Sequence, residues 1–143
     1  MNVYLNALLA YFAAVFVSFA RGATIKTALY ASFVSAICYF IYLVIPHDKS
    51  AYFISSAILM LLCEMFARIS KRPAIIFLVI GIYPLVPGSG LYKTFLELFN
   101  KNYEKALVIG GDTLVNLTIM AVSIAFVSTC FKISKNFKKM HNA

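Results

Sequence analysis

Long apolar runs separated by short polar segments dominate the pattern of this chain. The runs cover residues 3–20, 27–46, 51–67, 74–87 and 106–131, and the segments between them are Arg21–Lys26, His47–Ser50, Arg68–Pro73 and Gly88–Lys105. A membrane-crossing helix needs about 20 mostly apolar residues, and four of the runs are long enough. We therefore expect an all-α integral membrane protein, a compact bundle of four to five transmembrane helices forming one domain over residues 1–143.

The fourth run, Ala74–Pro87, differs from the others. It is short for a hydrocarbon core about 30 Å thick, and it contains Gly81, Pro84 and Pro87. Proline removes a backbone donor and breaks or kinks a helix. The pattern predicts a Pro/Gly-broken fourth helix, which either crosses the membrane or re-enters it.

Composition agrees with a membrane setting. Hydrophobic residues make up 62% of the chain, charged residues 13%, and the mean hydropathy is +0.87, whereas soluble domains carry about 25% charged residues. The net charge of +8 arises from lysines and arginines that lie between the apolar runs. Such placement marks membrane topology and gives no indication of a nucleic-acid partner.

The basic residues also favour an orientation. With five spans, nine lysines and arginines fall on the side of the C-terminus and four on the other. A re-entrant fourth segment would give eight against five. Because cytoplasmic loops carry the excess of Lys and Arg, the count favours five spans, an external N-terminus and a cytoplasmic C-terminus.

Small residues recur every four positions in the first two runs. Such ladders let helices approach closely in a membrane, so we expect these two helices to pack tightly, in the simplest case against each other; ordinary use of Ala and Ser is the alternative. The ladders are Ala10, Ala14, Ser18 and Gly22 in the first run, and Thr24, Ala28, Ser32 and Ala36 in the second.

Residues 91–105 have a different pattern. Leu91, Phe95, Leu98 and Phe99 share one helical stripe, and the charged residues lie largely elsewhere. This predicts an amphipathic helix lying at the outer membrane interface.

The broken segment is a candidate substrate site. Backbone groups freed at membrane depth must be satisfied by protein, water or a ligand, and a helix beginning near Ser89 would present free amides to a carboxylate. The alternative is a turn at the membrane surface. The candidate substrate-binding residues are Pro84, Pro87, Gly88, Ser89, Gly90 and Tyr92, with Asn116 added from the last run.

Two carboxylates fall inside predicted spans, where ionisable groups are functional candidates by default. Glu64 is a candidate proton carrier, or else an ion-pair partner of Arg68 one turn later. Asp112 shares a helical face with Asn116 and follows Gly110-Gly111. Its alternative is a position just outside the hydrocarbon.

Enzyme signatures are absent from the sequence. The histidines, His47 and His141, lie in a loop and a tail, and no metal-ligand or nucleotide motif occurs. Cys38, Cys63 and Cys130 each lie in an apolar run, as packing residues do. We expect no enzyme activity, no metal and no cofactor.

The stretch Ile82–Tyr92 resembles the P-x-x-P-G-x-x-x-Y signature of the threonine/serine exporter family, through Pro84, Pro87, Gly88 and Tyr92. Glu64, Ala67-Arg68 and Lys71-Arg72-Pro73 are similar to the helix that precedes this signature in the family. The resemblance covers about Phe19–Phe131 and includes the order and length of the helices.

The resemblance implies a prokaryotic inner-membrane transporter that exports small hydrophilic metabolites, either threonine and serine or a dicarboxylate such as succinate, using the proton gradient. Single-chain members carry a further, larger membrane region that this sequence lacks. The resemblance therefore implies the small subunit of a split two-component exporter with a larger membrane partner. A homo-oligomer is an alternative assembly, and a non-transporting scaffold or assembly factor is the alternative function.

Overall fold

The computed structural model describes residues 3–45 and 49–141, with side chains described as far as residue 134. Its helices are α1 (Val3–Ala20), α2 (Ile25–Val44), α3 (Lys49–Ser70), α4 (Ala74–Gly81), α5 (Gly88–Phe99) and α6 (Tyr103–His141). Four helical segments of this described part are long and apolar enough to cross a membrane: α1, α2, α3 and Tyr103–Ser134 of α6. The predicted all-α membrane bundle is confirmed. The loop expected at His47–Ser50 lies mostly outside the described residues.

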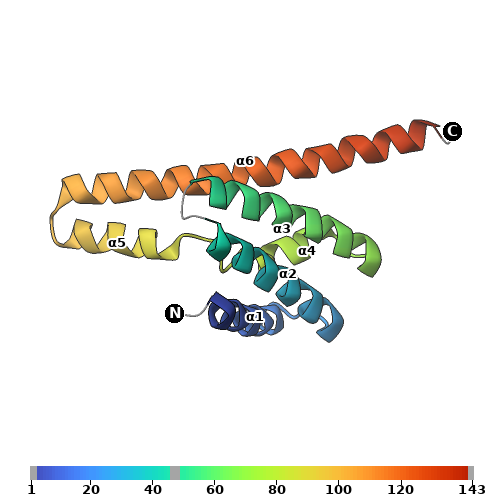
Figure 1. Cartoon of the computed structure of the whole chain (residues 1–143), viewed down its shortest axis with the longest axis horizontal. Coiled ribbons are helices and arrows are strands. Elements are labelled where there is room, and N and C mark those ends of the chain that lie inside the picture. The colour runs from blue at the N-terminus through green and yellow to red at the C-terminus, as the bar shows by residue number, and fades with distance from the viewer. Residues whose placement is uncertain (1–2, 46–48, 142–143) are drawn as a thin grey trace.

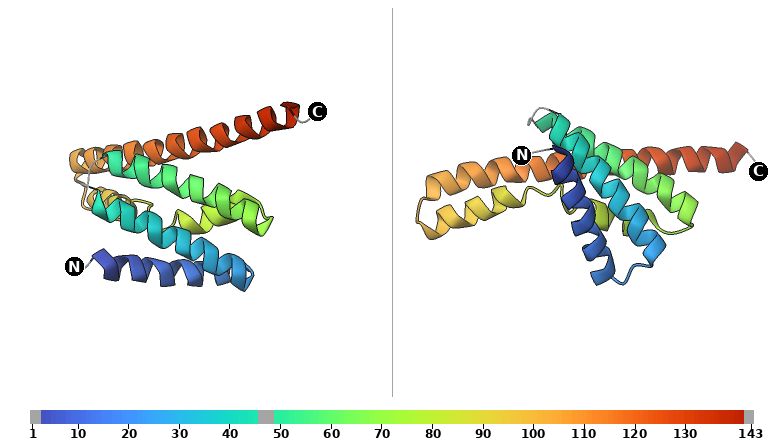
Figure 2. Two further views of the ribbon diagram at one scale, coloured as in Figure 1. Left: turned by 45° about the vertical axis from the view of Figure 1, so that its right-hand side comes forward. Right: turned by 60° about the horizontal axis from the view of Figure 1, so that its bottom comes forward.

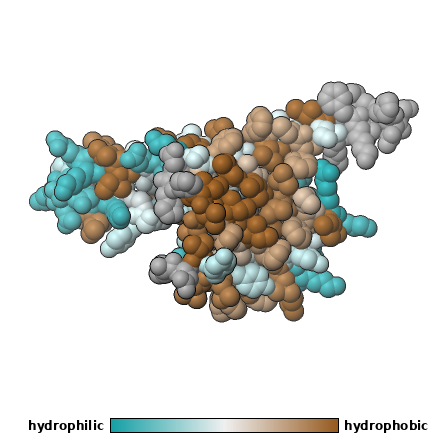
Figure 3. Space-filling view, viewed as in Figure 1, coloured by the Kyte–Doolittle hydropathy of each residue, from teal (hydrophilic) through white to brown (hydrophobic). Residues whose placement is uncertain are grey.

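The helices α1, α2 and α3 run alternately back and forth, and α6 lies against α3 (Figures 1 and 2). The connections after α1 and after α3 lie at the same end as the C-terminus of α6. The start of α1 and the end of α2 lie at the opposite end. Apolar surface covers the middle of the molecule, and polar surface gathers towards both ends (Figure 3). This distribution suits a protein that crosses a bilayer.

The fourth helix is broken, and its helical part is shorter than the apolar run suggested. α4 has 8 residues, which is about 12 Å of helix, and it ends at Gly81 rather than at Pro87. It starts beside the end of α3 and returns into the bundle, and α5 then continues past the opposite end (Figure 1). α4 and α5 together thus travel the length that a single spanning helix would.

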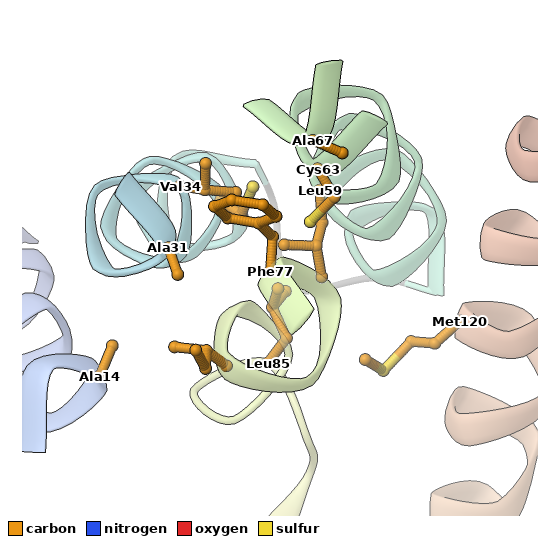
Figure 4. Close-up of a cluster of buried hydrophobic side chains, with 11 residues drawn as sticks. Ala14, Ala31, Val34, Leu59, Cys63, Ala67, Phe77, Leu85 and Met120 are labelled. Carbon is orange, nitrogen blue, oxygen red and sulfur yellow. The ribbon is translucent and has the colours of Figure 1, made fainter. Parts of the chain in front are cut away.

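The core forms around α4. Phe77 is fully buried, and it points between Val34 of α2 and the Leu59–Cys63 stretch of α3 (Figure 4). A Cβ atom built on Gly81 would lie 2.6 Å from Cδ1 of the fully buried Leu59. Glycine is therefore what allows the end of α4 to approach α3 so closely.

The small-residue ladder of α1 is buried, and α1 packs mainly against α2. Its buried residues are Ala10, Ala14 and Ser18, and in α2 Ala28 and Ser32 are buried as well. Gly22 lies after the end of α1 with a φ of 68°, a conformation in which glycine is favoured. The expected tight packing of the first two helices is confirmed.

The α5–α6 arm, which we define as α5 together with residues 103–118 of α6, projects beyond the other helices (Figure 1). Within the described residues, α5 contacts α6 and no other helix. Two small-residue contacts join them, because a Cβ on Gly90 would meet Thr113, and a Cβ on Gly110 would lie 3.0 Å from Cγ2 of Thr94.

The amphipathic segment expected at 91–105 is divided in the structure. α5 ends at Phe99, because Lys101 adopts a φ of 59° and the amide of Asn102 bonds the carbonyl of Glu97 at 2.9 Å. This is a common way for a helix to terminate. The apolar stripe of α5 is exposed rather than packed against protein, and Phe99 is 83% exposed.

Candidate functional site

The break between α4 and α5 frees backbone groups inside the protein. Pro84 and Pro87 have no amide hydrogen, so the carbonyls of Ile80 and Tyr83 lose the donors that a continuous helix would supply. The chain turns instead, and the amides of Leu85 and Val86 both bond the carbonyl of Ile82, at 3.0 and 3.2 Å. Leu85 is buried in the core beside this turn.

The residues that follow the break have unequal environments. Pro87 is buried, whereas Gly88, Ser89 and Tyr92 are exposed. A Cβ on Gly88 would meet nothing within 4 Å, so no close contact requires glycine there. The start of α5 has no side-chain cap, and the amide of Ser89 bonds no acceptor in the described part of the chain.

Asn116 lies on α6 between two residues that approach the segment around the break. Thr113 faces Gly90, and Leu117 lines the same cleft as Val86. The side-chain oxygen of Asn116 is buried and has no hydrogen-bond donor among the described residues. A buried acceptor without a donor is costly, and a ligand with an N–H group would satisfy it.

A cleft of about 580 Å³ opens between α3, α4 and α6. Its walls are mostly apolar, with Ile75 from α4, Ile82 directly after α4, and Met120 and Ile124 from α6. Glu64, Ser128 and Lys132 are the polar exceptions. We call this hollow the Glu64 cleft, because Glu64 is a half-buried carboxylate at its side.

Glu64 and Arg68 do not form an ion pair in the described structure. The guanidinium carbon of Arg68 lies instead 5.1 Å from the centroid of the Phe131 ring, within the range of a cation–π contact. The simple structural explanation of Glu64 as the partner of Arg68 is therefore not supported.

Asp112 lies apart from Glu64. It is exposed on the α5–α6 arm, and Ser128, which shares the Glu64 cleft, comes sixteen residues later on the same helix. This separation is about 24 Å along α6. The structure thus does not bring the two candidate carboxylates together.

Several polar residues around these features were not identified from the sequence. Ser128 and Lys132 lie four residues apart on α6 and both face the Glu64 cleft, a spacing that the helical period could have revealed. Arg21 hydrogen-bonds Tyr83 across 62 positions, and no sequence pattern signals that pair. In the described part of the chain, no three His, Cys, Asp or Glu side chains gather as metal ligands would.

Comparison with known proteins gives one match. The family model described as threonine/serine exporter, ThrE, matches residues 6–130. No curated protein and no solved structure matches the chain.

Proposed function

Since the chain belongs to the threonine/serine exporter family, we propose that it is the small subunit of a two-component secondary exporter. Its substrates would be small hydrophilic metabolites, either threonine and serine or a dicarboxylate such as succinate. Protons moving down their gradient would drive export, and a larger membrane subunit of the same family would complete the path. The protein would lie in the inner membrane of a prokaryote with its C-terminus in the cytoplasm.

The observation that supports the substrate site is the buried, unsatisfied oxygen of Asn116, which lies on α6 between Thr113 and Leu117. A zwitterionic amino acid offers an ammonium group to such an oxygen. Its carboxylate would suit the uncapped start of α5, where the amide of Ser89 is free of protein acceptors, because helix N-termini favour anions. Broken helices serve substrates in this way in other secondary transporters.

Glu64 is the carboxylate that we propose for proton coupling. It is half-buried at the side of a mainly apolar cleft, and no described residue forms an ion pair with it. Lys132 lines the same cleft. Asp112 is exposed on the arm, so it would take part in proton coupling only if the partner subunit covered it.

The α5–α6 arm supports the proposal of a larger partner. Its α5 packs on α6 alone among the described helices, and large apolar side chains remain exposed on it, including Leu107 at 77%. Asp112 is exposed on the same surface. A polar group on a lipid-facing helix is costly, so a protein partner suits this surface better than lipid alone.

The test is efflux from proteoliposomes loaded with labelled threonine, serine or succinate, under an imposed proton gradient. Vesicles would contain this chain, the larger family subunit, or both. We expect export of at least one substrate only from vesicles with both chains. If the pair moves none of the three, the substrate assignment is wrong, and a scaffold or assembly role becomes the better explanation.

The site is tested by Asn116→Leu, which keeps the side-chain volume and removes both polar atoms. We expect loss of export with normal membrane insertion. The matched control is Thr118→Val on the same helix, because Thr118 is exposed and bonds only its own helix at the Leu114 carbonyl. Equal export by both variants would argue against a substrate role for Asn116.

A further inference from the structure

A second cleft, of about 310 Å³, lies between the α1–α2 connection and α4. We call it the arginine cleft. The loop side contributes Arg21, Gly22, Ala23, Thr24 and Thr27, and the α4 side contributes Arg72, Ile75, Ile76, Val79 and Ile80. It shares only Ile75 with the residues that line the Glu64 cleft.

The polar side of the arginine cleft carries positive charge without compensation. Arg21 and Arg72 both line it, and none of its lining residues is acidic. Arg21 donates to the neutral hydroxyl of Tyr83, and no ion pair of Arg72 occurs in the described residues. Two guanidinium groups at one cleft are suited to a phosphate group, which accepts several charge-assisted hydrogen bonds.

A pair of threonine hydroxyls lies at the same cleft. The side-chain oxygens of Thr24 and Thr27 lie 2.9 Å apart; Thr24 is exposed, whereas Thr27 is only 4% exposed. Either hydroxyl can donate to the other, and the second can then donate to an acceptor bound in the cleft.

Two helices begin at this cleft. α2 follows Thr24 and α4 follows Pro73, and neither start has a side-chain cap. Their first amides therefore add partial positive charge beside the two arginines. The guanidinium groups, the hydroxyl pair and both helix starts all favour an anion at this position.

The apolar wall indicates which anion. Ile75, Ile76, Val79 and Ile80 continue the cleft along α4, and Ile75 is 59% exposed on the surface of the bundle. A small hydrophilic metabolite would gain no binding energy from this apolar wall, whereas the acyl chain of a lipid would pack along it. We propose that the arginine cleft binds an anionic phospholipid, with its phosphate between Arg21 and Arg72 and its acyl chain along α4.

The test is native mass spectrometry of the full chain in detergent, titrated with phosphatidylglycerol or phosphatidylcholine. The variant Arg21→Gln/Arg72→Gln removes two charges from the cleft. The control Lys26→Gln/Lys71→Gln removes two charges from exposed positions near the same two helix ends, neither of which lines the cleft. Both variants lose the same general attraction to anionic lipid.

We expect the unaltered chain to bind phosphatidylglycerol about tenfold more tightly than phosphatidylcholine. The arginine variant should lose this preference, and the lysine variant should keep it to within about threefold. Arg72→Gln alone serves if the double variant misfolds, because Arg72 lacks the hydrogen bond that holds Arg21. An equal loss in both double variants, or no preference in the unaltered chain, overturns the proposal.

Inorganic phosphate, threonine and succinate distinguish a lipid from a free anion. Each is added in excess to the complex with phosphatidylglycerol. Retention of the lipid supports the proposal. If one of the soluble anions displaces the lipid, and if its own binding is lost in the Arg21→Gln/Arg72→Gln variant, the cleft is a site for soluble anions. That result would overturn the proposal.

Discussion

The guanidinium group of Arg21 donates a hydrogen bond of 2.8 Å to the hydroxyl of Tyr83, although 62 positions separate the two residues. The guanidinium carbon also lies 6.0 Å from the centroid of the Tyr83 ring. Arg21 follows α1 directly, and Tyr83 lies in the turn after α4. One polar contact therefore links the first connection of the bundle to the break in its fourth helix.

Tyr83→Phe removes this hydrogen bond and keeps the ring. Because both side chains are exposed, we expect a modest loss of stability, at most about 1 kcal/mol. Thermal unfolding in detergent measures it, with Tyr103→Phe as the control on an exposed ring. Identical midpoints for the two variants would show that the contact contributes nothing to stability.

Gly81→Ala tests the close approach of α4 to α3. The added Cβ would lie 2.6 Å from Cδ1 of the fully buried Leu59, so the Leu59 side chain or the backbone of α4 would have to shift. We expect a loss of about 1–3 kcal/mol in the free energy of unfolding. Leu59→Val in the same chain should recover part of this loss. A destabilised Gly81→Ala that Leu59→Val does not improve would contradict the contact.

Gly88→Leu and Gly90→Leu form a matched pair on one turn of α5. A side chain on Gly88 meets open space, whereas one on Gly90 meets Thr113, with Cγ2 at 3.2 Å. We expect Gly90→Leu to separate α5 from α6, lowering a disulfide cross-link between cysteines introduced across the arm. Gly88→Leu should keep that cross-link. If Gly88→Leu keeps the cross-link but abolishes export, the exposed Gly88 position contacts the substrate or the partner subunit. Normal export by Gly88→Leu would exclude Gly88 from the site.

Glu64→Gln removes the proposed proton carrier and keeps its shape. We expect proton-driven export by the two-chain exporter to fall at least about tenfold, as for loss of a proton-transfer group. Arg68→Gln should reduce export much less, because Arg68 contacts the Phe131 ring rather than Glu64. Initial rates under an imposed gradient measure both. Equal defects would indicate that the two residues act as a pair.

The helix pattern was predictable, and the break was predictable from Pro84 and Pro87, because backbone chemistry is local. The small residues Ala10, Ala14 and Ser18 also identified the packed face of α1. In a membrane, apolar side chains gain little by leaving lipid, so small residues mark contacts better than large ones.

The same preference for small residues at helix contacts explains how α5 packs on α6, which the apolar pattern of residues 91–105 did not predict. Leu91, Phe95 and Phe99 predicted an interfacial stripe, and these side chains are exposed, whereas α5 contacts α6 through Gly90 and Thr94. The turn at Lys101 depends on a single left-handed residue that is not glycine, which sequence rules do not anticipate.

The candidate sites were less accessible from the sequence. The signature residues identified the break, but the two clefts combine side chains from segments far apart in the chain. The Arg21–Tyr83 bond arises from the relative placement of two segments that are 62 positions apart. Glu64 was identified by its charge inside a predicted span and by the family resemblance, and its lack of an ion-pair partner required the structure.

The length of α6 has a mechanical consequence. This helix runs without interruption from the arm, past the hydrogen bond of 2.8 Å between Ser123 and the Phe53 carbonyl, to Ser128 and Lys132 at the Glu64 cleft. A continuous helix is stiff, because each turn is bonded to the next. It would therefore act as a lever pivoting near Ser123, so that a partner tilting the arm would move Ser128 and Lys132 relative to Glu64.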